Sequence, residues 1–262
     1  MPSEFAGKVV VVTGGSRGIG RAIAEAFARE RAAMVLAASS PANLEVAAEA
    51  ITSGGAAAPM TCAGDLRTID ACQQLFKTVN ERHGRCDILV NSAGATRAGA
   101  FLDLPDDAWS DGFALKFLGA VRLTRLFWPL LKAAHGHVVN VIGGAARTPD
   151  PEFLIGSSVN GALATFSKGL SQLGKRDGVN VNAIHPGATE TERTKQLWAQ
   201  RAAALGKSVD DIREQIMARS GVRSIAKPED IAAVALFLCS TGARQIQGVA
   251  VAVDGGGTPG VY

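Results

Sequence analysis

The feature that most constrains this chain is a run of valines followed by a glycine-rich turn and a helical pattern. Val9–Val12 favours a short buried strand, because β-branched side chains suit a pleated surface that is covered on both faces. Beyond the turn, apolar residues recur at helical spacing between positions 19 and 27. The turn itself contains Gly14, Gly18 and Gly20. The stretch therefore predicts a strand, a turn and a helix in immediate succession.

Glycines at these positions permit a sharp turn, close approach of a pyrophosphate to backbone N–H groups, and close helix–strand packing. The helix N-terminus adds a partial positive charge that favours phosphate. A glycine triplet alone also occurs in ordinary connections, but here the strand, the glycines and the amphipathic helix agree within one unit. The stretch therefore predicts a dinucleotide-binding turn. The residues expected to contact the cofactor there are Gly14, Ser16, Arg17, Gly18, Ile19 and Gly20.

The alternation of buried strands and helices continues along the chain, which predicts a parallel sheet with helices on both faces. With 262 residues and 47% hydrophobic content, the chain is expected to form one domain, 1–262. We expect an α/β fold with a doubly wound sheet of the Rossmann type and about seven strands. Beyond the first unit, the expected strands lie within 33–38, 57–64, 87–90, 137–142, 179–184 and 248–253, and the expected helices within 42–53, 71–82, 106–134, 153–175, 193–219 and 228–240.

The charge of the chain is nearly balanced, with 27 basic against 24 acidic residues and a net charge of +3. Because no block of like charges occurs, neither nucleic acid nor an anionic membrane is an expected partner. The four cysteines lack paired spacing and histidines at metal-ligand spacing, which indicates free thiols in a reducing compartment and no metal site. The first residues lack a signal-peptide pattern and no apolar run has membrane-spanning length, so a cytoplasmic location is expected.

Ser39 follows the second expected strand, where an acidic residue would normally accept hydrogen bonds from the ribose 2′-hydroxyl of NAD. Ser39 and Ser40 can instead donate to a 2′-phosphate, and Arg17 can reach it with a charged guanidinium. These residues predict that NADP(H) is preferred over NAD(H). The alternative is a solvated arginine beside a polar strand end.

Two further segments follow expected strands, and α/β sheets bind ligands outside the carboxyl ends of their strands. The segment 91–94 consists of small residues that permit close approach of a ribose. Asp65 is able to accept a hydrogen bond from an adenine amino group, or to cap the helix expected near Ala71. Position alone does not separate these two roles.

Six segments, in this order, closely resemble the motifs of the short-chain dehydrogenase/reductase family over nearly the whole chain. They are 13–20 (TGGSRGIG), 65–66 (DL), 91–94 (NSAG), 139–141 (VNV), 186–191 (PGATET) and 253–256 (VDGG). The resemblance implies a dimer or tetramer that uses NAD(P)(H) to interconvert alcohols and carbonyl compounds. It implies that Thr191 lies near the nicotinamide carboxamide and that 191–219 forms a substrate lid. Further cofactor contacts are then expected from Asp65, Leu66, Asn91, Ala93, Gly94, Pro186, Gly187, Thr189 and Thr191.

The family carries a catalytic tetrad of Asn, Ser, Tyr and Lys, and the resemblance aligns other residues with all four positions. In that order, the positions hold Lys116, Gly143, Gly156 and Asn160. Hydride delivery to a carbonyl carbon builds negative charge on oxygen, so an acid must give a proton and a hydroxyl must hold the oxygen. Glycine supplies neither group. The family reaction is therefore expected to be absent or impaired.

Other residues are weighed as substitutes for the missing acid. Lys116 offers an ammonium whose pKa burial would lower, but it equally fits an ordinary helix lysine whose head reaches water. His185 either faces the pocket or serves as a hydrogen-bonded spacer at a strand end. Ser157 and Ser158 lie on helix faces rotated from position 156 by about 100° and 200°. Tyr262, the single tyrosine, lies at a chain end that in family tetramers can approach a neighbouring subunit.

Two functional hypotheses follow from these residues. The first is an NADP(H)-dependent oxidoreductase that acts on a small carbonyl or alcohol with a non-standard proton donor such as Lys116. The second is a nucleotide-binding subunit or sensor without turnover.

The long helix expected over 153–175 is rich in glycine, and each glycine in a helix interior costs roughly 1 kcal/mol against alanine. Close packing of this helix against a second subunit would offset that cost. The pattern therefore favours a homodimer or homotetramer.

Overall fold

Within residues 3–259, which the computed structural model describes, seven parallel strands form one sheet in the order β3-β2-β1-β4-β5-β6-β7. This order confirms the expected doubly wound α/β architecture. The strands are β1 (Val9–Thr13), β2 (Ala33–Ala38), β3 (Met60–Ala63), β4 (Ile88–Asn91), β5 (His137–Val141), β6 (Asn180–Pro186) and β7 (Ala250–Val253). The strand order reverses between β1 and β4, and the carboxyl ends of these two strands open the crevice that such sheets use for ligands.

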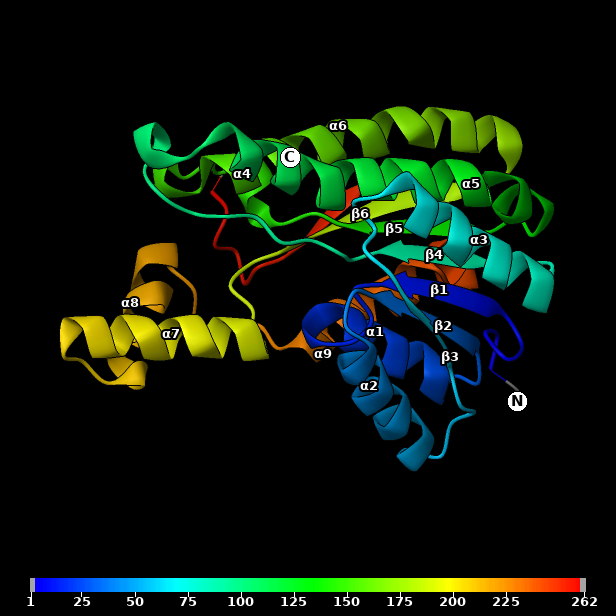
Figure 1. Ribbon diagram of the computed structural model, residues 1–262, viewed down its shortest axis with the longest axis horizontal. Coiled ribbons are helices and arrows are strands. Elements are labelled where there is room, and N and C mark those ends of the chain that lie inside the picture. Colours follow the sequence, from blue (N-terminus) through cyan, green and yellow to red (C-terminus); the bar gives the residue numbers. More distant parts are fainter. Residues whose placement is uncertain (1–2, 260–262) are drawn as a thin grey trace.

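Helices cover both faces of the sheet (Figure 1). One face carries α1 (Gly18–Arg29), α2 (Pro41–Ser53) and α9 (Pro228–Leu238), and the other carries α3 (Ile69–His83), α5 (Gly119–Ala133) and α6 (Leu154–Asp177). α4 (Asp106–Gly112) precedes α5, while α7 (Glu192–Leu205) and α8 (Val209–Ser220) form an arm beside the body. Short 3₁₀ turns are η1 (Phe101–Asp103), η3 (Gly144–Ala146), η4 (Pro151–Phe153) and η5 (Thr241–Ala243).

The valines of β1 show how the two faces are filled. Val10 and Val12 pack in the core shared with α1 and α9, whereas Val9 and Val11 pack in the core shared with α3 and α5. Because successive side chains of a strand point to opposite faces, a continuous valine run is buried only when both faces are covered. None of the helices in residues 3–259 combines the length and apolar character that a membrane crossing requires.

The sequence predicts one helical stretch over the polar segment 193–219, but the structure contains two helices there. α7 ends at Gly206, whose φ of 62° lies in the left-handed region that glycine favours. Ser208 then caps α8, because its side chain accepts a hydrogen bond from the backbone N–H of Asp211. The short Gly-Lys-Ser sequence therefore carries both a stop signal and a start signal.

The helix expected over 106–134 runs from Asp106 to Ala133, and it contains a π-helical stretch, η2 (Phe113–Leu118), between α4 and α5. Glycines flank this stretch where neighbours come close. A Cβ at Gly112 would lie 2.7 Å from the Ile155 side chain, and one at Gly119 would lie 3.0 Å from the Leu66 carbonyl oxygen. Since π-helical turns are rare and often found at functional sites, the position of Lys116 within η2 makes this residue a candidate for a functional role.

Candidate functional site

The predicted phosphate-binding turn connects β1 to α1. Gly14 has a φ of 66°, and a Cβ there would lie 3.0 Å from backbone atoms of Ala93. A Cβ at Gly20 would lie 2.3 Å from the carbonyl oxygen of Gly14, and Gly18 has a φ of 56°. Arg17 is the N-cap residue of α1, but its side chain caps none of the first backbone N–H groups. The turn therefore presents open N–H groups at a helix N-terminus, which suits an anion.

Thr13 ties this turn to the loop that follows β4. Its Oγ1 accepts hydrogen bonds from the backbone N–H groups of Ser92 and Ala93, both at 3.1 Å. Gly14 packs on the same loop, so the two sides of the crevice are fixed to each other. Sequence reasoning did not assign a role to Thr13, although its place directly before the first glycine was a usable signal.

The expected ribose-binding residues lie at the start of α2. Ser40 is the N-cap residue of this helix, and its Oγ accepts a hydrogen bond from the Asn43 backbone N–H at 3.3 Å. Its hydroxyl hydrogen is not used by that bond. Ser39 and Arg17 are both exposed. A helix N-terminus and two hydroxyl groups therefore lie at the end of β2, and the guanidinium belongs to the turn after the neighbouring strand β1.

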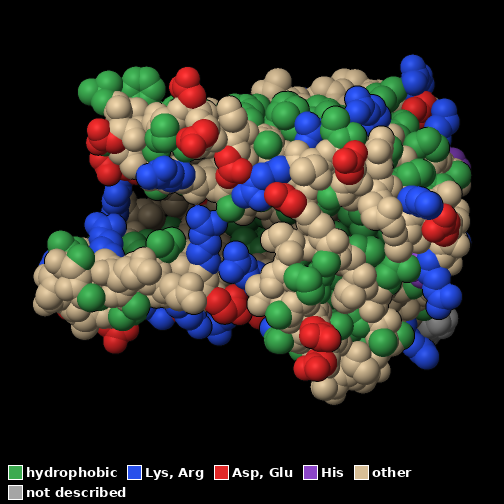
Figure 2. Space-filling view, in the orientation of Figure 1, with side chains coloured by type: hydrophobic (Ala, Val, Ile, Leu, Met, Phe, Trp, Pro, Cys, Tyr) green, Lys and Arg blue, Asp and Glu red, His purple; other side chains and the backbone are tan. Residues whose placement is uncertain are grey.

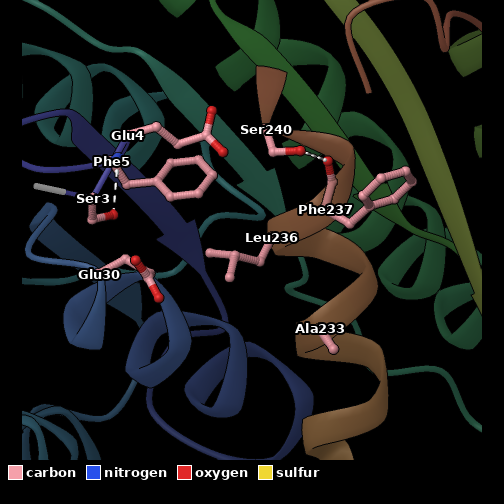
Figure 3. A pocket seen from close by; sticks show the side chains of 8 residues that line it. All are labelled: Ser3, Glu4, Phe5, Glu30, Ala233, Leu236, Phe237 and Ser240. Atoms are coloured by element: carbon pink, nitrogen blue, oxygen red, sulfur yellow. Dashed lines mark hydrogen bonds between the residues drawn. The ribbon is translucent and has the colours of Figure 1, made fainter. Parts of the chain in front are cut away.

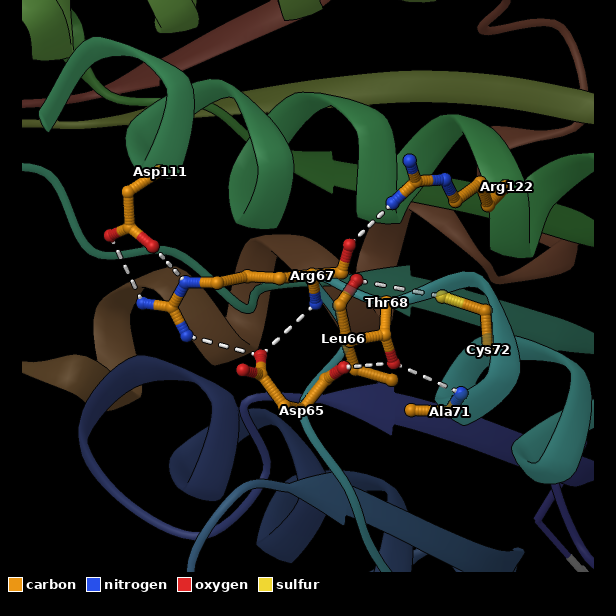
Figure 4. Close-up of polar contacts among 8 residues, drawn as sticks. All are labelled: Asp65, Leu66, Arg67, Thr68, Ala71, Cys72, Asp111 and Arg122. Carbon is orange, nitrogen blue, oxygen red and sulfur yellow. Dashed lines mark hydrogen bonds and ion pairs between the residues drawn. The ribbon is translucent and has the colours of Figure 1, made fainter. Parts of the chain in front are cut away.

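Asp65 does not cap α3, so that expected alternative is wrong. The N-cap residue is Thr68, whose side chain accepts from the Ala71 N–H. Asp65 instead accepts hydrogen bonds from the backbone N–H and the Nη1 of Arg67, both at 3.1 Å (Figure 4). Arg67 also pairs with Asp111, which links this loop to α4. Asp65 fails as a cap because it lies three residues before Thr68, which already holds the capping position.

Leu66, which follows β3, and Asn91, at the end of β4, are both buried. The Leu66 carbonyl oxygen accepts a hydrogen bond from the thiol of Cys72 (Figure 4). The Asn91 Nδ2 donates to Thr124 Oγ1 at 3.1 Å and to Asn140 Oδ1 at 2.8 Å. These bonds hold the end of β4 against β5 and α5, so the Nδ2 group of Asn91 is engaged within the protein.

The loop after β6 closes the other side of the crevice. Thr191 caps α7 by accepting a hydrogen bond from the Thr194 N–H at 3.2 Å. A Cβ at Gly18 would lie 3.3 Å from Thr191 Cγ2, so the N-termini of α1 and α7 meet. Gly187 fits closely against Asp254, which a Cβ would approach to 2.7 Å. The structure thereby brings the predicted Pro186–Thr191 segment next to the glycine turn.

Gly143 and Asn160, two of the residues that the resemblance aligns with the tetrad, lie side by side. Gly143 has a φ of 110°, and a Cβ there would lie 3.1 Å from Asn160 Nδ2. Asn160 is 4% exposed, and its Oδ1 receives no hydrogen bond from the described residues. His185 is also buried, and its Nδ1–H donates to the Gly143 carbonyl oxygen at 3.0 Å. Burial, followed by the charges of Arg147 and Lys116, lowers the pKa of His185, although the Gly143 bond opposes this.

Gly156 lies under the ring of Phe153. A Cβ at Gly156 would lie 2.0 Å from ring atoms of Phe153, so the ring occupies the space into which a larger side chain would extend. The sequence reading did not single out Phe153, although it lies three residues before Gly156. Ser157 is buried and accepts from the Asp150 N–H at 3.3 Å, whereas Ser158 is exposed. Tyr262 lies outside the described residues.

Lys116 lies in the crevice with its stem against the loop after β4. A Cβ at Gly94 would lie 2.9 Å from Lys116 Cδ. Loss of water, followed by the charge of Arg193, lowers the pKa of Lys116 from 10.5 to about 8. Arg193 reaches across from α7, and its Nη2 donates to the Thr96 carbonyl oxygen at 3.5 Å. Sequence reasoning assigned no role to Arg193; its position two residues after Thr191 was the available signal.

Two surface pockets lie away from this crevice. One, of about 350 Å³, lies between the N-terminal segment and α9 (Figure 3). Its wall has structural roles: Phe5 packs edge to face on Phe27, and Glu4 accepts from the Thr241 N–H at 2.8 Å. The other, of about 480 Å³, lies at the edge of the sheet beside Cys62. Of the predicted site residues, only Leu66 lines either pocket.

Comparisons with known proteins give a consistent picture. The family model of short chain dehydrogenase matches residues 8–202. The chain is 31% identical over 261 residues to the uncharacterized oxidoreductase YvrD of Bacillus subtilis, with 98% of each chain covered. It is 29% identical over 254 residues to the 3-oxoacyl-(acyl-carrier-protein) reductase FabG of Vibrio harveyi, covering 95% of this chain and 97% of that one. The structure of L-sorbose reductase from Gluconobacter frateurii, complexed with NADPH and L-sorbose, superposes with a TM-score of 0.95 at 30% identity over 100% of both chains. The chain therefore belongs to the short-chain dehydrogenase family.

Proposed function

We propose that this protein binds NADP(H) in the crevice between β1 and β4, and that ordinary carbonyl reduction is absent or strongly impaired in it. The observation that carries the second part is the packing of Phe153 over Gly156. A phenyl ring there has no proton to give. The protein would then act as a nucleotide-binding subunit or sensor.

The residues at the crevice fit a nicotinamide dinucleotide. The glycine turn leaves room where a Cβ would collide, and the first N–H groups of α1 have no side-chain acceptor. The buried Oδ1 of Asn160 lacks a donor, which a ribose hydroxyl would supply, and buried acceptors are seldom left unpaired. A bound nicotinamide would deliver or accept a hydride. The protein's own residues would bind and orient it, with Thr191 and the Pro186-Gly187 turn beside Gly18.

Cofactor choice is proposed to favour NADP(H). Ser40 at the N-terminus of α2, together with Ser39 and Arg17, offers donors and positive charge to a 2′-phosphate. The similarity to a reductase complexed with NADPH supports this choice. The remaining predicted contacts, from Asp65 to Gly94, would line the adenosine and ribose side.

Any turnover by the family route would need a proton donor, which the positions aligned with the family's Ser, Tyr and Lys do not supply. Losing a general acid typically reduces the rate by about 10²–10⁴, and losing an oxyanion donor by about 10²–10³, without simple additivity. Gly143 and Gly156 offer no hydroxyl, and the Asn160 amide is not an acid at neutral pH. Carbonyl reduction by the family route would therefore be slow or absent.

A second candidate is an active oxidoreductase, for a small carbonyl or alcohol, in which Lys116 gives the proton. The observation that favours it is the lowered pKa of Lys116, about 8, at a position beside Gly94 in the crevice. A lysine with a pKa near the working pH is a competent general acid.

We also propose assembly as a homodimer or homotetramer, through α6, and a reducing cytoplasmic environment. A Cβ at Gly161 or Gly169 of α6 would meet no atom within 4 Å, so packing within the chain does not explain these glycines. The four cysteines are free thiols, which suits such an environment.

Calorimetric titration with NADP⁺ and NAD⁺, followed by a turnover assay against a carbonyl panel, tests the proposal. NADP⁺ should bind more tightly, and turnover should stay at background. Arg17→Ala should weaken NADP⁺ binding by about 10-fold or more, because a charge-assisted hydrogen bond is lost, and leave NAD⁺ binding nearly unchanged. Arg21→Ala is the matched control, since Arg21 pairs with Glu25 on the same helix. Equal affinities for the two nucleotides, or robust turnover, would contradict the proposal, and robust turnover that requires Lys116 would favour the second candidate.

A further inference from the structure

We propose that Lys116 and Arg193 together bind an anionic group, a carboxylate or a phosphate, on the small molecule that occupies the crevice. This inference rests on the proposed function, because it concerns the ligand beside the bound dinucleotide. It assigns a substrate class and gives Arg193 a role in specificity.

The two cations come from separate elements and meet at one loop. Lys116 extends from η2, and its methylene groups cover Gly94. Arg193 extends from the first turn of α7 and donates to the Thr96 carbonyl oxygen at 3.5 Å. Gly94 and Thr96 are two residues apart, so both positive groups lie over the loop 94–96. The charge of Arg193 is close enough to lower the pKa of Lys116.

Three acidic residues of the surrounding elements are already engaged. Glu190 pairs with Arg213, and Asp111 pairs with Arg67. The carboxylate of Asp254 accepts hydrogen bonds from two backbone N–H groups, at 2.9 and 3.0 Å. Within residues 3–259, no ion pair neutralises either of the two cations over loop 94–96. The protein therefore brings two like charges together without an ion pair to either of them among the described residues.

Such an arrangement is unfavourable in the free protein and becomes favourable when a ligand brings the anion. The planar guanidinium of Arg193 can hold two oxygens of a carboxylate or phosphate, and Lys116 adds a compact positive charge. Basic side chains line both sides of the hollow between the arm and the body (Figure 2). Approaching anions would therefore be attracted into this hollow.

The phosphates of the dinucleotide are the competing occupants, but they have partners elsewhere. The open N–H groups of α1 suit the diphosphate, and the N-terminus of α2 with Ser39 and Ser40 suits a 2′-phosphate. Neither place requires Lys116 or Arg193. An anion from the substrate is the group that these two residues still lack.

Isothermal titration of NADP⁺-saturated protein, with a charged and an uncharged probe of similar size, tests this inference. The probes are 4-oxopentanoate, its methyl ester and methyl phosphate. The wild-type protein should bind at least one of the two anions about 10-fold more tightly than the ester, and the stronger anion identifies the group. This preference should be lost in Arg193→Gln and in Lys116→Met.

Arg201→Gln is the matched control, because Arg201 is an exposed arginine on the same helix, two turns further along. It should keep the anion preference. NADP⁺ affinity is measured for every variant, and an equal loss of NADP⁺ affinity in Arg193→Gln would assign the cations to the dinucleotide and overturn the inference. Equal binding of anions and ester would also overturn it while leaving dinucleotide binding intact. Failure of NADP⁺ to bind would refute the proposed function; the same titrations on the free protein would then decide the anion site separately.

Discussion

Lys116 combines a partly buried position with a pKa of about 8, which predicts a pH dependence for any turnover in which Lys116 gives the proton. A lysine can give a proton only while it is protonated, and burial and the charge of Arg193 lower the pKa of Lys116 from 10.5 to about 8. If Lys116 is the donor, the rate of carbonyl reduction should therefore be constant at low pH and fall about tenfold per unit above pH 8. A rate profile from pH 6 to 10 at saturating NADPH measures this.

Other charged groups near Lys116 set the position of that midpoint. Arg193 lowers the pKa, and a bound anion would offset this repulsion and move the midpoint to higher pH. Lys116→Met should abolish the activity with NADPH affinity unchanged. Lys77→Met, at an exposed position of α3, should change neither quantity. Activity that survives in Lys116→Met would exclude Lys116 as the donor and point to a water relay or to the substrate itself.

At the scale of a single element, α6 separates two reasons for glycine in a helix. Gly174 needs glycine for packing within the chain, because a Cβ there would lie 2.2 Å from the Val179 carbonyl oxygen. Gly161 and Gly169, two turns apart, meet open space. Their cost to the helix is therefore not offset within the chain, which is the reason to expect a second subunit against α6.

Replacing Gly161 and Gly169 with alanine distinguishes a subunit interface from an exposed helix face. In a monomer, each change should stabilise the fold by about 0.5–1 kcal/mol, because alanine is the better helix former. At a close helix–helix interface, the added methyl groups should weaken assembly. Sedimentation velocity and thermal unfolding of wild type and double variant measure both effects. Gly174→Ala should destabilise the fold in either case, and a wild-type monomer at micromolar concentration would contradict the proposed interface.

Local sequence patterns predicted most elements of this fold because their signals are local. The valine run, the glycine turn and the helical spacing each depend on neighbours in sequence. The break between α7 and α8 had such a signal as well, in Gly206 and Ser208, and was missed. Hydrogen bonding excludes the capping role of Asp65, because Arg67 engages its carboxylate and Thr68 caps the helix.

The site was predictable only in part, because long-range packing decides which side chains meet. The pairing of Lys116 with Arg193 depends on how the arm lies over loop 94–96, and no spacing in the sequence encodes that contact. The placement of Phe153 over Gly156 is an intermediate case. The two residues are three apart, so their proximity was available from the sequence, but the direction of the ring was not.

At the scale of the whole molecule, the crevice joins parts of the chain that are far apart. Thr13 and Gly14 hold the loop after β4, and Gly18 meets Thr191 at the start of α7. A dinucleotide bound there would contact the glycine turn, the end of β4 and the base of the arm at once. Binding should therefore stabilise the entire fold by mass action, whether or not any reaction follows.

Thermal unfolding with and without nucleotide, at fixed protein concentration, measures this coupling. A nucleotide present at 100 times its dissociation constant adds about 2.7 kcal/mol to the free energy of unfolding. For a domain of this size, each kcal/mol raises the Tm by about 2–4 °C, so NADPH should raise it by about 5–10 °C. NADH at the same concentration, if it binds about tenfold more weakly, should give roughly half that shift, because the gain varies with the logarithm of affinity. Arg17→Ala should bring the NADPH shift down to the NADH value. Equal shifts in the wild type would contradict the assignment of Arg17, Ser39 and Ser40 to a 2′-phosphate. A binding protein that has lost the family's proton donor should instead show the full NADPH shift and consume no NADPH in the presence of carbonyl compounds.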